Sequence, residues 1–171
     1  MSEETLGPVV SSAHLASGRF PEISEMEFAL TLANNAFHRW MVRCMATSGY
    51  PELSPLEVLV LHTVFHRDKP KKLADICLVL NIEDTHTVNY AVRKLKSAGL
   101  VVEGRLGKEK TVGVTEAGAK ACNDYRDMRD RLLLRSLAAL DLEPEEVSKL
   151  AALMRLMSGQ YDQAARAATT F

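Results

Sequence analysis

The 171-residue sequence has little cysteine, few aromatic residues and no long hydrophobic run. Its three cysteines, Cys44, Cys77 and Cys122, are odd in number and far apart, and no CxxC pair is present, so no disulfide framework is expected. No apolar run approaches the roughly 18 to 20 residues that a membrane-spanning helix needs, and the N-terminus lacks a signal-peptide pattern. We therefore expect a cytoplasmic protein that does not enter a membrane.

Catalytic signatures are also missing from the sequence. It contains no nucleophile–base motif and no glycine loop that would cradle a phosphate group. His62 and His66 stand four residues apart, as metal ligands on a helix can, but no third ligand type lies near them in sequence. We interpret them as a polar helix edge and predict no enzymatic activity, no metal and no cofactor.

One segment carries a clear pattern, that of a short amphipathic helix over residues 85–97. Its apolar residues recur at helical spacing: Val88, Ala91, Val92 and Leu95. Its opposite face is polar: His86, Asn89, Tyr90, Arg93, Lys94 and Ser97. Asp84 suits the N-cap, and Gly99 follows the last turn, where a left-handed residue is expected. The apolar face can therefore pack while the polar face stays available to a partner.

The flanking segments complete a winged helix. A preceding helix is predicted over about residues 71–80, and two helices in this order form a helix-turn-helix, whose second helix enters a major groove. The buried positions of that preceding helix would be Leu73, Ile76, Cys77 and Leu80. Residues 100–102 and 111–114 favour strands, and the glycine-rich basic stretch between them predicts a hairpin that turns at residues 107–109. A helix-turn-helix followed directly by a basic hairpin is a winged helix.

The charge distribution supports a nucleic-acid partner. The whole chain has a net charge of only −1, but the segment from Arg67 to Lys110 contains ten Lys or Arg residues against six Asp or Glu. A charge run is usually no more than a solvated surface. Here the excess falls on the predicted recognition helix and wing, which favours double-stranded DNA as the partner.

Three further helices lie outside the winged helix. The first begins at a capping box formed by Ser24 and Glu27 and runs to about residue 47. A second capping box, formed by Ser54 and Glu57, begins the first helix of the winged helix itself. The other two follow the wing and carry surplus apolar residues, which would be exposed in an isolated chain. A two-fold homodimer would bury them and place two recognition helices on one side. Packing into the core of their own subunit is the alternative.

The sequence thus predicts a mainly α-helical fold with a small β-hairpin wing. Its length and composition are those of one globular domain. Residues 1–22 would form an N-terminal arm, residues 23–50 a dimerisation helix and residues 51–115 the winged helix-turn-helix DNA-binding domain. Residues 116–171 would supply the C-terminal dimerisation helices.

Several short motifs together resemble the MarR family of bacterial regulators. They are Leu73-Ala74-Asp75, Thr87-Val88, Leu95 with Gly99-Leu100-Val101, and Val114-Thr115-Glu116-Ala117-Gly118. The resemblance covers roughly residues 24–160, the size of one domain. It implies a triangular homodimer, an operator with two half-sites, and repression relieved by small molecules or oxidation. The wing of that family usually carries an Asp-x-Arg pair, whereas Leu106 and Lys108 stand at those places here.

Contacts with DNA can be assigned by residue type. Base reading is expected from His86, Asn89, Tyr90 and Arg93. Because Asn pairs well with adenine and Arg with guanine, Asn89 and Arg93 are the best candidates for sequence choice. Phosphate contacts are expected from the remaining polar residues of the helix and from the wing: Thr85, Thr87, Lys94, Lys96, Arg105, Lys108 and Lys110. Tyr90 could instead pack against a neighbouring element, and Lys96 could be a solvated cation.

An effector pocket is a further hypothesis, drawn mainly from the resemblance. Its lining would be Trp40, Arg43, Cys44, His62 and His66, around a small aromatic or anionic ligand. A plain hydrophobic core explains Trp40 and Cys44 equally well. Either Cys44 or Cys122 could be a redox-sensing thiol, although buried packing is the commoner role of a free cysteine.

The function predicted from the sequence is that of a sequence-specific DNA-binding transcriptional regulator. It would act as a homodimer on a pseudo-palindromic operator and would respond to a small-molecule or redox signal. The alternative is a winged helix that serves as a protein-interaction module without binding DNA. The basic recognition face argues against that alternative.

Overall fold

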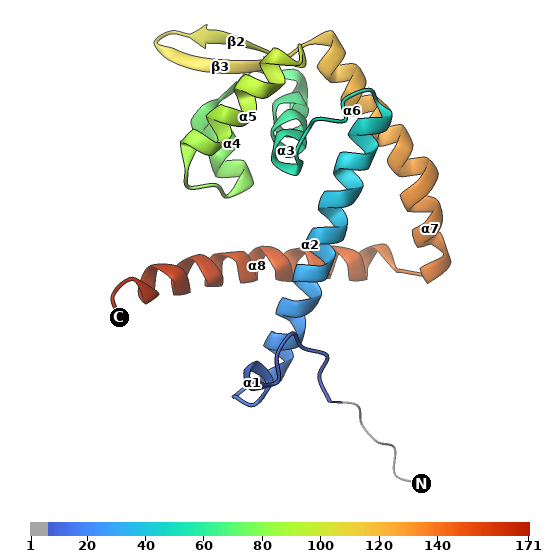
Figure 1. The fold of residues 1–171 in the computed structure, drawn as a ribbon, viewed down its shortest axis with the longest axis vertical. Coiled ribbons are helices and arrows are strands. Elements are labelled where there is room, and N and C mark those ends of the chain that lie inside the picture. Colours follow the sequence, from blue (N-terminus) through green and yellow to red (C-terminus); the bar gives the residue numbers. More distant parts are fainter. Residues whose placement is uncertain (1–6) are drawn as a thin grey trace. The chain divides into compact units, whose positions relative to one another are not determined.

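The structure, a computed structural model, describes residues 7–171. The chain divides into two compact units, which meet in sequence between Arg126 and Asp127. The first unit contains a helix-turn-helix with a β-hairpin, and the second contains the long C-terminal helix (Figure 1). The predicted fold class, mainly helical with a small wing, is confirmed.

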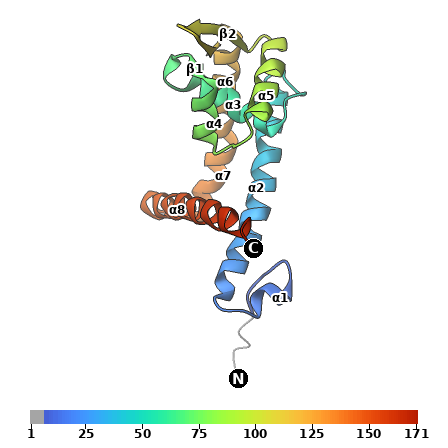
Figure 2. The ribbon, with the colours of Figure 1, turned by 90° about the vertical axis from the view of Figure 1, so that its left-hand side faces the viewer.

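The chain begins with the short helix α1 (Ala13–Ala16) and the long helix α2 (Pro21–Thr47). The predicted capping box at Ser24 and Glu27 is wrong, because α2 begins earlier, with Pro21 in its first turn and Phe20 as the N-cap in a left-handed conformation. The Ser24 hydroxyl instead donates a hydrogen bond of 2.7 Å to the carbonyl oxygen of Leu15. The described part of the predicted arm therefore folds back beside the start of α2 (Figure 2), while its first six residues lie outside the described range.

Helix α3 (Pro55–Phe65) has the predicted capping box: the backbone N–H of Glu57 donates to the Ser54 hydroxyl, and the Ser54 N–H donates to the Glu57 carboxylate. A single 3₁₀ turn, η1 (His66–Asp68), follows it. Helix α4 (Leu73–Leu80) then begins two residues later than predicted. Residues 71 and 72 are not helical but form the short strand β1 (Lys71–Lys72), because their backbone pairs with the far strand of the wing.

The second helix of the helix-turn-helix, α5 (Thr85–Ser97), has the predicted bounds. The wing consists of β2 (Val101–Leu106) and β3 (Glu109–Val114), and the sheet order is β1-β3-β2, antiparallel throughout. Leu106 pairs with Glu109, so a two-residue turn joins the strands at the predicted place. The first turn residue, Gly107, has a φ of +63°, a conformation that glycine adopts without steric cost.

The core of the first unit lies between α2, α3, α5 and the base of the wing. All four residues of the predicted packing face of α5 are buried, together with apolar residues of the neighbouring elements. The most deeply buried larger side chains are Met41, Met45, Leu61, Ile76, Leu95 and Leu100. Of the predicted core positions on α4, Ile76 and Cys77 are buried, whereas Leu73 and Leu80 are half-buried.

Helix α6 (Glu116–Met128) follows the wing, and beyond residue 126 the chain belongs to the second unit. The helical path continues through a π-helical segment (Arg129–Leu134), α7 (Arg135–Leu137) and a 3₁₀ turn (Ala138–Leu140). The last helix, α8 (Pro144–Ala168), runs through Gly159 without interruption. Within residues 7–171, every helix is too short or too polar to traverse a lipid bilayer.

Candidate nucleic-acid interface

The recognition helix α5 is fixed at its start by the side chain of Asp84. One carboxylate oxygen accepts a hydrogen bond of 2.8 Å from the backbone N–H of His86, and the other accepts one of 2.8 Å from the Thr87 hydroxyl. The Thr87 hydroxyl, followed by this backbone N–H, lowers the pKa of Asp84 below its ordinary value. The predicted N-cap is therefore confirmed, and the hydroxyl that was expected to contact a phosphate group is already bonded within the helix.

The side of α5 that faces away from the core is exposed over its whole length. His86, Arg93 and Tyr90 are exposed, with 57% of Tyr90 accessible to solvent. Asn89, the expected adenine reader, is half-buried. Three of the four predicted base readers thus lie open to a partner, and the fourth stands at the margin of the helix face.

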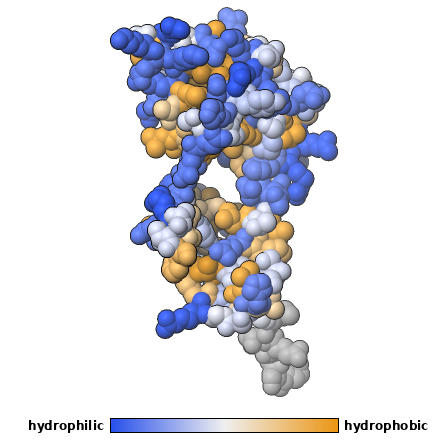
Figure 3. Space-filling view, turned by 60° about the vertical axis from the view of Figure 1, so that its left-hand side comes forward, coloured by the Kyte–Doolittle hydropathy of each residue, from blue (hydrophilic) through white to orange (hydrophobic). Residues whose placement is uncertain are grey.

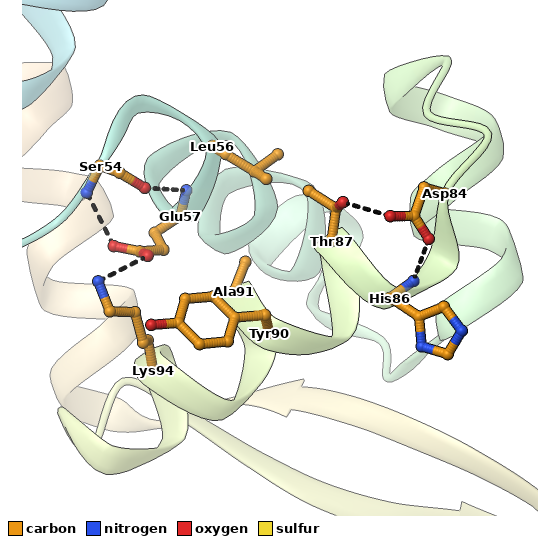
Figure 4. A pocket seen from close by; sticks show the side chains of 9 residues that line it. All are labelled: Ser54, Leu56, Glu57, Asp84, His86, Thr87, Tyr90, Ala91 and Lys94. Carbon is orange, nitrogen blue, oxygen red and sulfur yellow. Dashed lines mark hydrogen bonds and ion pairs between the residues drawn. The ribbon is translucent and has the colours of Figure 1, made fainter.

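The two lysines expected to hold phosphate groups have carboxylate partners in the chain itself. The ammonium group of Lys94 lies 3.2 Å from the carboxylate of Glu57 on α3, and this hydrogen bond is the main reason that the pKa of Lys94 is raised (Figure 4). Lys96 pairs with Glu103 on β2, and the lysine lowers the pKa of the Glu103 carboxyl. Helical spacing predicts neither of these partners, since neither Glu57 nor Glu103 lies within one helical turn of its lysine.

The wing presents further cations. Arg105 and Lys110 are cross-strand neighbours, and Lys108 lies in the turn between the strands, with all three exposed. Glu109 pairs with Lys72 of β1, an interaction that raises the pKa of the lysine. The predicted phosphate contacts of the wing are thus gathered on one hairpin, which projects past α4 and α5 in Figure 1.

The residues expected to line an effector pocket lie in two kinds of environment. Arg43 and His66 are exposed, whereas Cys44 is buried and Trp40 and His62 are half-buried. The indole N–H of Trp40 and Nε2 of His62 are both buried without a hydrogen-bond partner. The imidazole packs edge-on against Tyr125 of α6, with ring centroids 4.6 Å apart, and burial lowers the pKa of His62. These two buried polar atoms therefore lack hydrogen-bond partners in the helical core, and buried polar atoms without a partner are uncommon in folded proteins.

The thiols proposed as redox sensors are protected. Burial raises the pKa of Cys44 to about 11 and that of Cys122 to about 12. Because the thiolate is the reactive form, both side chains are poor nucleophiles at neutral pH. Among residues 7–171, moreover, no group of three or more His, Cys, Asp or Glu side chains is placed to hold a metal ion.

A cavity of about 500 Å³ lies between the start of α3 and one flank of α5 (Figure 4). Its lining is Ser54, Leu56, Glu57, Asp84, His86, Thr87, Tyr90, Ala91 and Lys94. No pattern in the sequence indicates this cavity. Helical spacing does place Thr87, Ala91 and Lys94 on one flank of α5, but spacing alone does not show which element faces that flank.

Similarity to known proteins indicates which kind of domain has this geometry. Residues 53–118 match the model of a family described as the winged helix DNA-binding domain. None of the curated proteins matches the sequence.

Several solved structures have the same fold. A MarR family transcriptional regulator from Rhodococcus sp. RHA1 is 16% identical, with a TM-score of 0.64, over 78% of this chain and 91% of that chain. CouR from Rhodococcus jostii RHA1, solved with p-coumaroyl-CoA, is 16% identical with a TM-score of 0.64, over 77% and 90%. A mutant MarR from E. coli, complexed with operator DNA, is 18% identical with a TM-score of 0.64, over 82% and 98%. Residues 53–118 therefore form a winged helix, and the chain has the fold of the MarR-family transcriptional regulators.

Proposed function

We propose that this protein is a sequence-specific DNA-binding transcriptional regulator that acts in the cytoplasm as a homodimer. The observation that carries the proposal is the recognition helix itself, whose outer face exposes His86, Tyr90 and Arg93 while its inner face is buried. Such a face suits the major groove, where side chains read base edges. The exposed cations of the adjacent wing suit the phosphate backbone, which positions the helix without reading sequence.

Exposed apolar surfaces support the homodimer. On α8, the apolar residues follow a spacing of three and four residues, as in a coiled-coil seam. They are Val147, Leu150, Met154, Met157 and Tyr161, all exposed or half-buried. On α2, Leu30, Leu32 and Phe37 are exposed as well. Hydrophobic side chains are also visible at the surface in Figure 3. A second copy of the chain would cover these surfaces and present two recognition helices to one duplex.

A small aromatic or anionic effector is the finer part of the proposal. The unpartnered N–H of Trp40 and Nε2 of His62 lie in the helical core of the first unit, where a ligand with polar atoms would satisfy them. The structural neighbour CouR was solved with p-coumaroyl-CoA, which has an aromatic acyl group and phosphate groups. A thermal-shift screen with aromatic carboxylates and acyl-CoA compounds tests this part. The absence of any ligand that both raises the melting temperature and changes DNA affinity would contradict it.

The central experiment is a selection of duplexes from a random-sequence DNA library by the wild-type protein at low salt. We expect enrichment of a site with two similar half-sites about one helical turn apart, because a two-fold dimer presents its recognition helices at that spacing. An electrophoretic shift with the selected duplex and an unrelated one then measures preference. If no sequence is enriched and no duplex is shifted, the protein-interaction alternative would replace this proposal.

A further inference from the structure

The recognition helix is tied to the rest of the first unit on both of its flanks. Residues of an α-helix follow one another at about 100°, so Lys94 and Lys96 leave α5 about 200° apart, on nearly opposite sides. Lys94 reaches Glu57 at the start of α3, and Lys96 reaches Glu103 on β2 of the wing. His86 and Arg93 lie between these two flanks, on the exposed side of the helix.

The carboxylate that pairs with Lys94, that of Glu57, is buried in the interior of the first unit. Only 4% of the Glu57 side chain is exposed, against 46% for Lys94. One carboxylate oxygen accepts a hydrogen bond of 2.8 Å from the Ser54 N–H, and the other faces the lysine ammonium group at 3.2 Å (Figure 4). A buried carboxylate is costly unless its oxygens are paired, so this geometry holds the lysine close to α3.

The aromatic ring of Tyr90 adds to this contact. The Lys94 ammonium group lies 5.6 Å from the centre of the ring, at the distance of a weak cation–π interaction. Tyr90 belongs both to the lining of the cavity beside α3 and to the exposed outer surface of α5. The lysine therefore contacts both the buried carboxylate and a side chain that faces the partner.

We propose that Lys94 and Lys96 are positioning residues: with Glu57 and Glu103 they form a two-sided ion-pair clamp that sets the rotation of the recognition helix about its own axis. The inference rests on the proposed function, since it assigns roles within the same DNA-binding surface. A rotation of α5 would move the side chains between the flanks away from the base edges. The clamp thus contributes to sequence preference without touching a base.

The competing role for Lys94 is a phosphate contact, and the two roles predict different behaviour. A phosphate-binding cation contributes equally to every DNA sequence, and its loss reduces the steepness of the salt dependence by about 0.9. A positioning cation contributes to the selected sequence alone. Its carboxylate partner must then matter as much as the lysine, although a carboxylate would repel DNA.

Matched substitutions separate these roles. E57Q removes the charge but keeps a side chain that can complete the capping box, so α3 retains its start. K94M keeps most of the aliphatic stem and removes the charge, whereas K94R keeps the charge. K96M and E103Q make the corresponding changes on the wing side, where both partners are more exposed.

The measurement is the affinity of each full-length variant for the duplex selected by the wild type and for an unrelated duplex, over a range of salt concentrations. E57Q and K94M should each lower the preference for the selected duplex about fivefold or more, the loss expected when one well-aligned base contact is lost. The double variant should be no worse than either single one, the salt dependence should be unchanged, and K94R should retain the preference. K96M and E103Q should show the same pattern with a smaller effect.

The clamp would be overturned if K94M weakened both duplexes equally and flattened the salt dependence while E57Q kept the wild-type preference. Circular dichroism checks the fold of each variant, and if E57Q did not fold, the salt dependence of K94M would still decide between the two roles. A wild-type protein that selects no duplex would instead refute the proposed function. The two failures are therefore distinguishable.

Discussion

At the scale of single residues, Gly118 lies where close packing leaves no room for a larger residue. A Cβ atom at this position would lie 2.1 Å from the carbonyl oxygen of Leu100 and 2.9 Å from a methyl group of Val114. We expect G118A to lower the free energy of unfolding by about 1–3 kcal/mol, because the start of α6 must move away from the wing. Urea denaturation at neutral pH measures this change.

Gly159 provides the matched control for that substitution. It also lies within a helix, but nothing stands within 4 Å of the position that its Cβ would occupy. G159A should therefore raise the free energy of unfolding by about 0.5–1 kcal/mol, the ordinary gain of alanine over glycine in a helix. Equal effects of the two substitutions would contradict the packing assigned to Gly118.

His62 gives a residue-scale prediction about pH. Burial lowers its pKa, so the folded protein keeps a neutral imidazole at a pH where the unfolded chain, with its ordinary pKa of about 6.5, takes up a proton. The free energy of unfolding must then fall as the pH drops below about 6.5, by at most about 1.4 kcal/mol per pH unit. H62F keeps an aromatic ring against Tyr125 and removes this proton. Urea denaturation at pH 7 and pH 5 should show a smaller loss for the variant, and identical losses would refute the assignment.

At the scale of elements, the recognition helix and the wing should contribute in different ways to DNA binding. Removing the guanidinium group of Arg93 should cost about 1–3 kcal/mol on the selected duplex and relax specificity at one base pair. K108A should weaken binding to every sequence and reduce the steepness of the salt dependence by about 0.9, because we propose that this lysine of the wing turn contacts backbone phosphate. Fluorescence anisotropy titrations at several salt concentrations measure both effects. An equal loss for R93A on random DNA would show that Arg93 contacts phosphate rather than a base.

The elements that were predicted correctly are those whose signals are local. The bounds of α5 followed from apolar spacing, the Asp84 cap and the glycine after the last turn, all within one short segment. The errors arose where another element decided the outcome. The short strand β1 exists because of its pairing with β3, and the start of α2 is shifted by Pro21 and by the contact of Ser24 with Leu15.

The same distinction applies to the candidate site. Exposure of His86 and Arg93 follows from helical periodicity, so it was predictable from sequence. The carboxylate partners of Lys94 and Lys96 were not, because Glu57 and Glu103 come from different elements that only the folded chain brings to α5. Sequence periodicity identifies the polar face of a helix, but it does not show which cations on that face are already paired.

At the scale of the whole molecule, assembly determines how many recognition helices reach the DNA. The apolar seam of α8, which runs from Val147 to Tyr161 at spacings of three and four residues, is largely exposed in the described chain. Helices with apolar residues at this spacing normally pack against another helix. A single winged helix makes few contacts, whereas two linked copies bind one duplex with an effective concentration that raises overall affinity. The affinity for an operator should therefore depend on residues of α8 that touch no DNA.

This dependence can be tested by placing charges in the seam. L150E combined with M154E puts two carboxylates in the middle of the apolar seam, and burying them against a second copy of the chain would be costly. We expect the double variant to have the mass of a monomer in analytical ultracentrifugation and to bind the selected duplex about 100-fold more weakly or worse. L156E is the control, because Leu156 is also exposed but points away from the seam, so the dimer should persist. If the double variant kept the mass of a dimer, α8 would not form the interface. If it were a monomer that bound DNA as tightly as the wild type, dimerisation would not be needed for recognition.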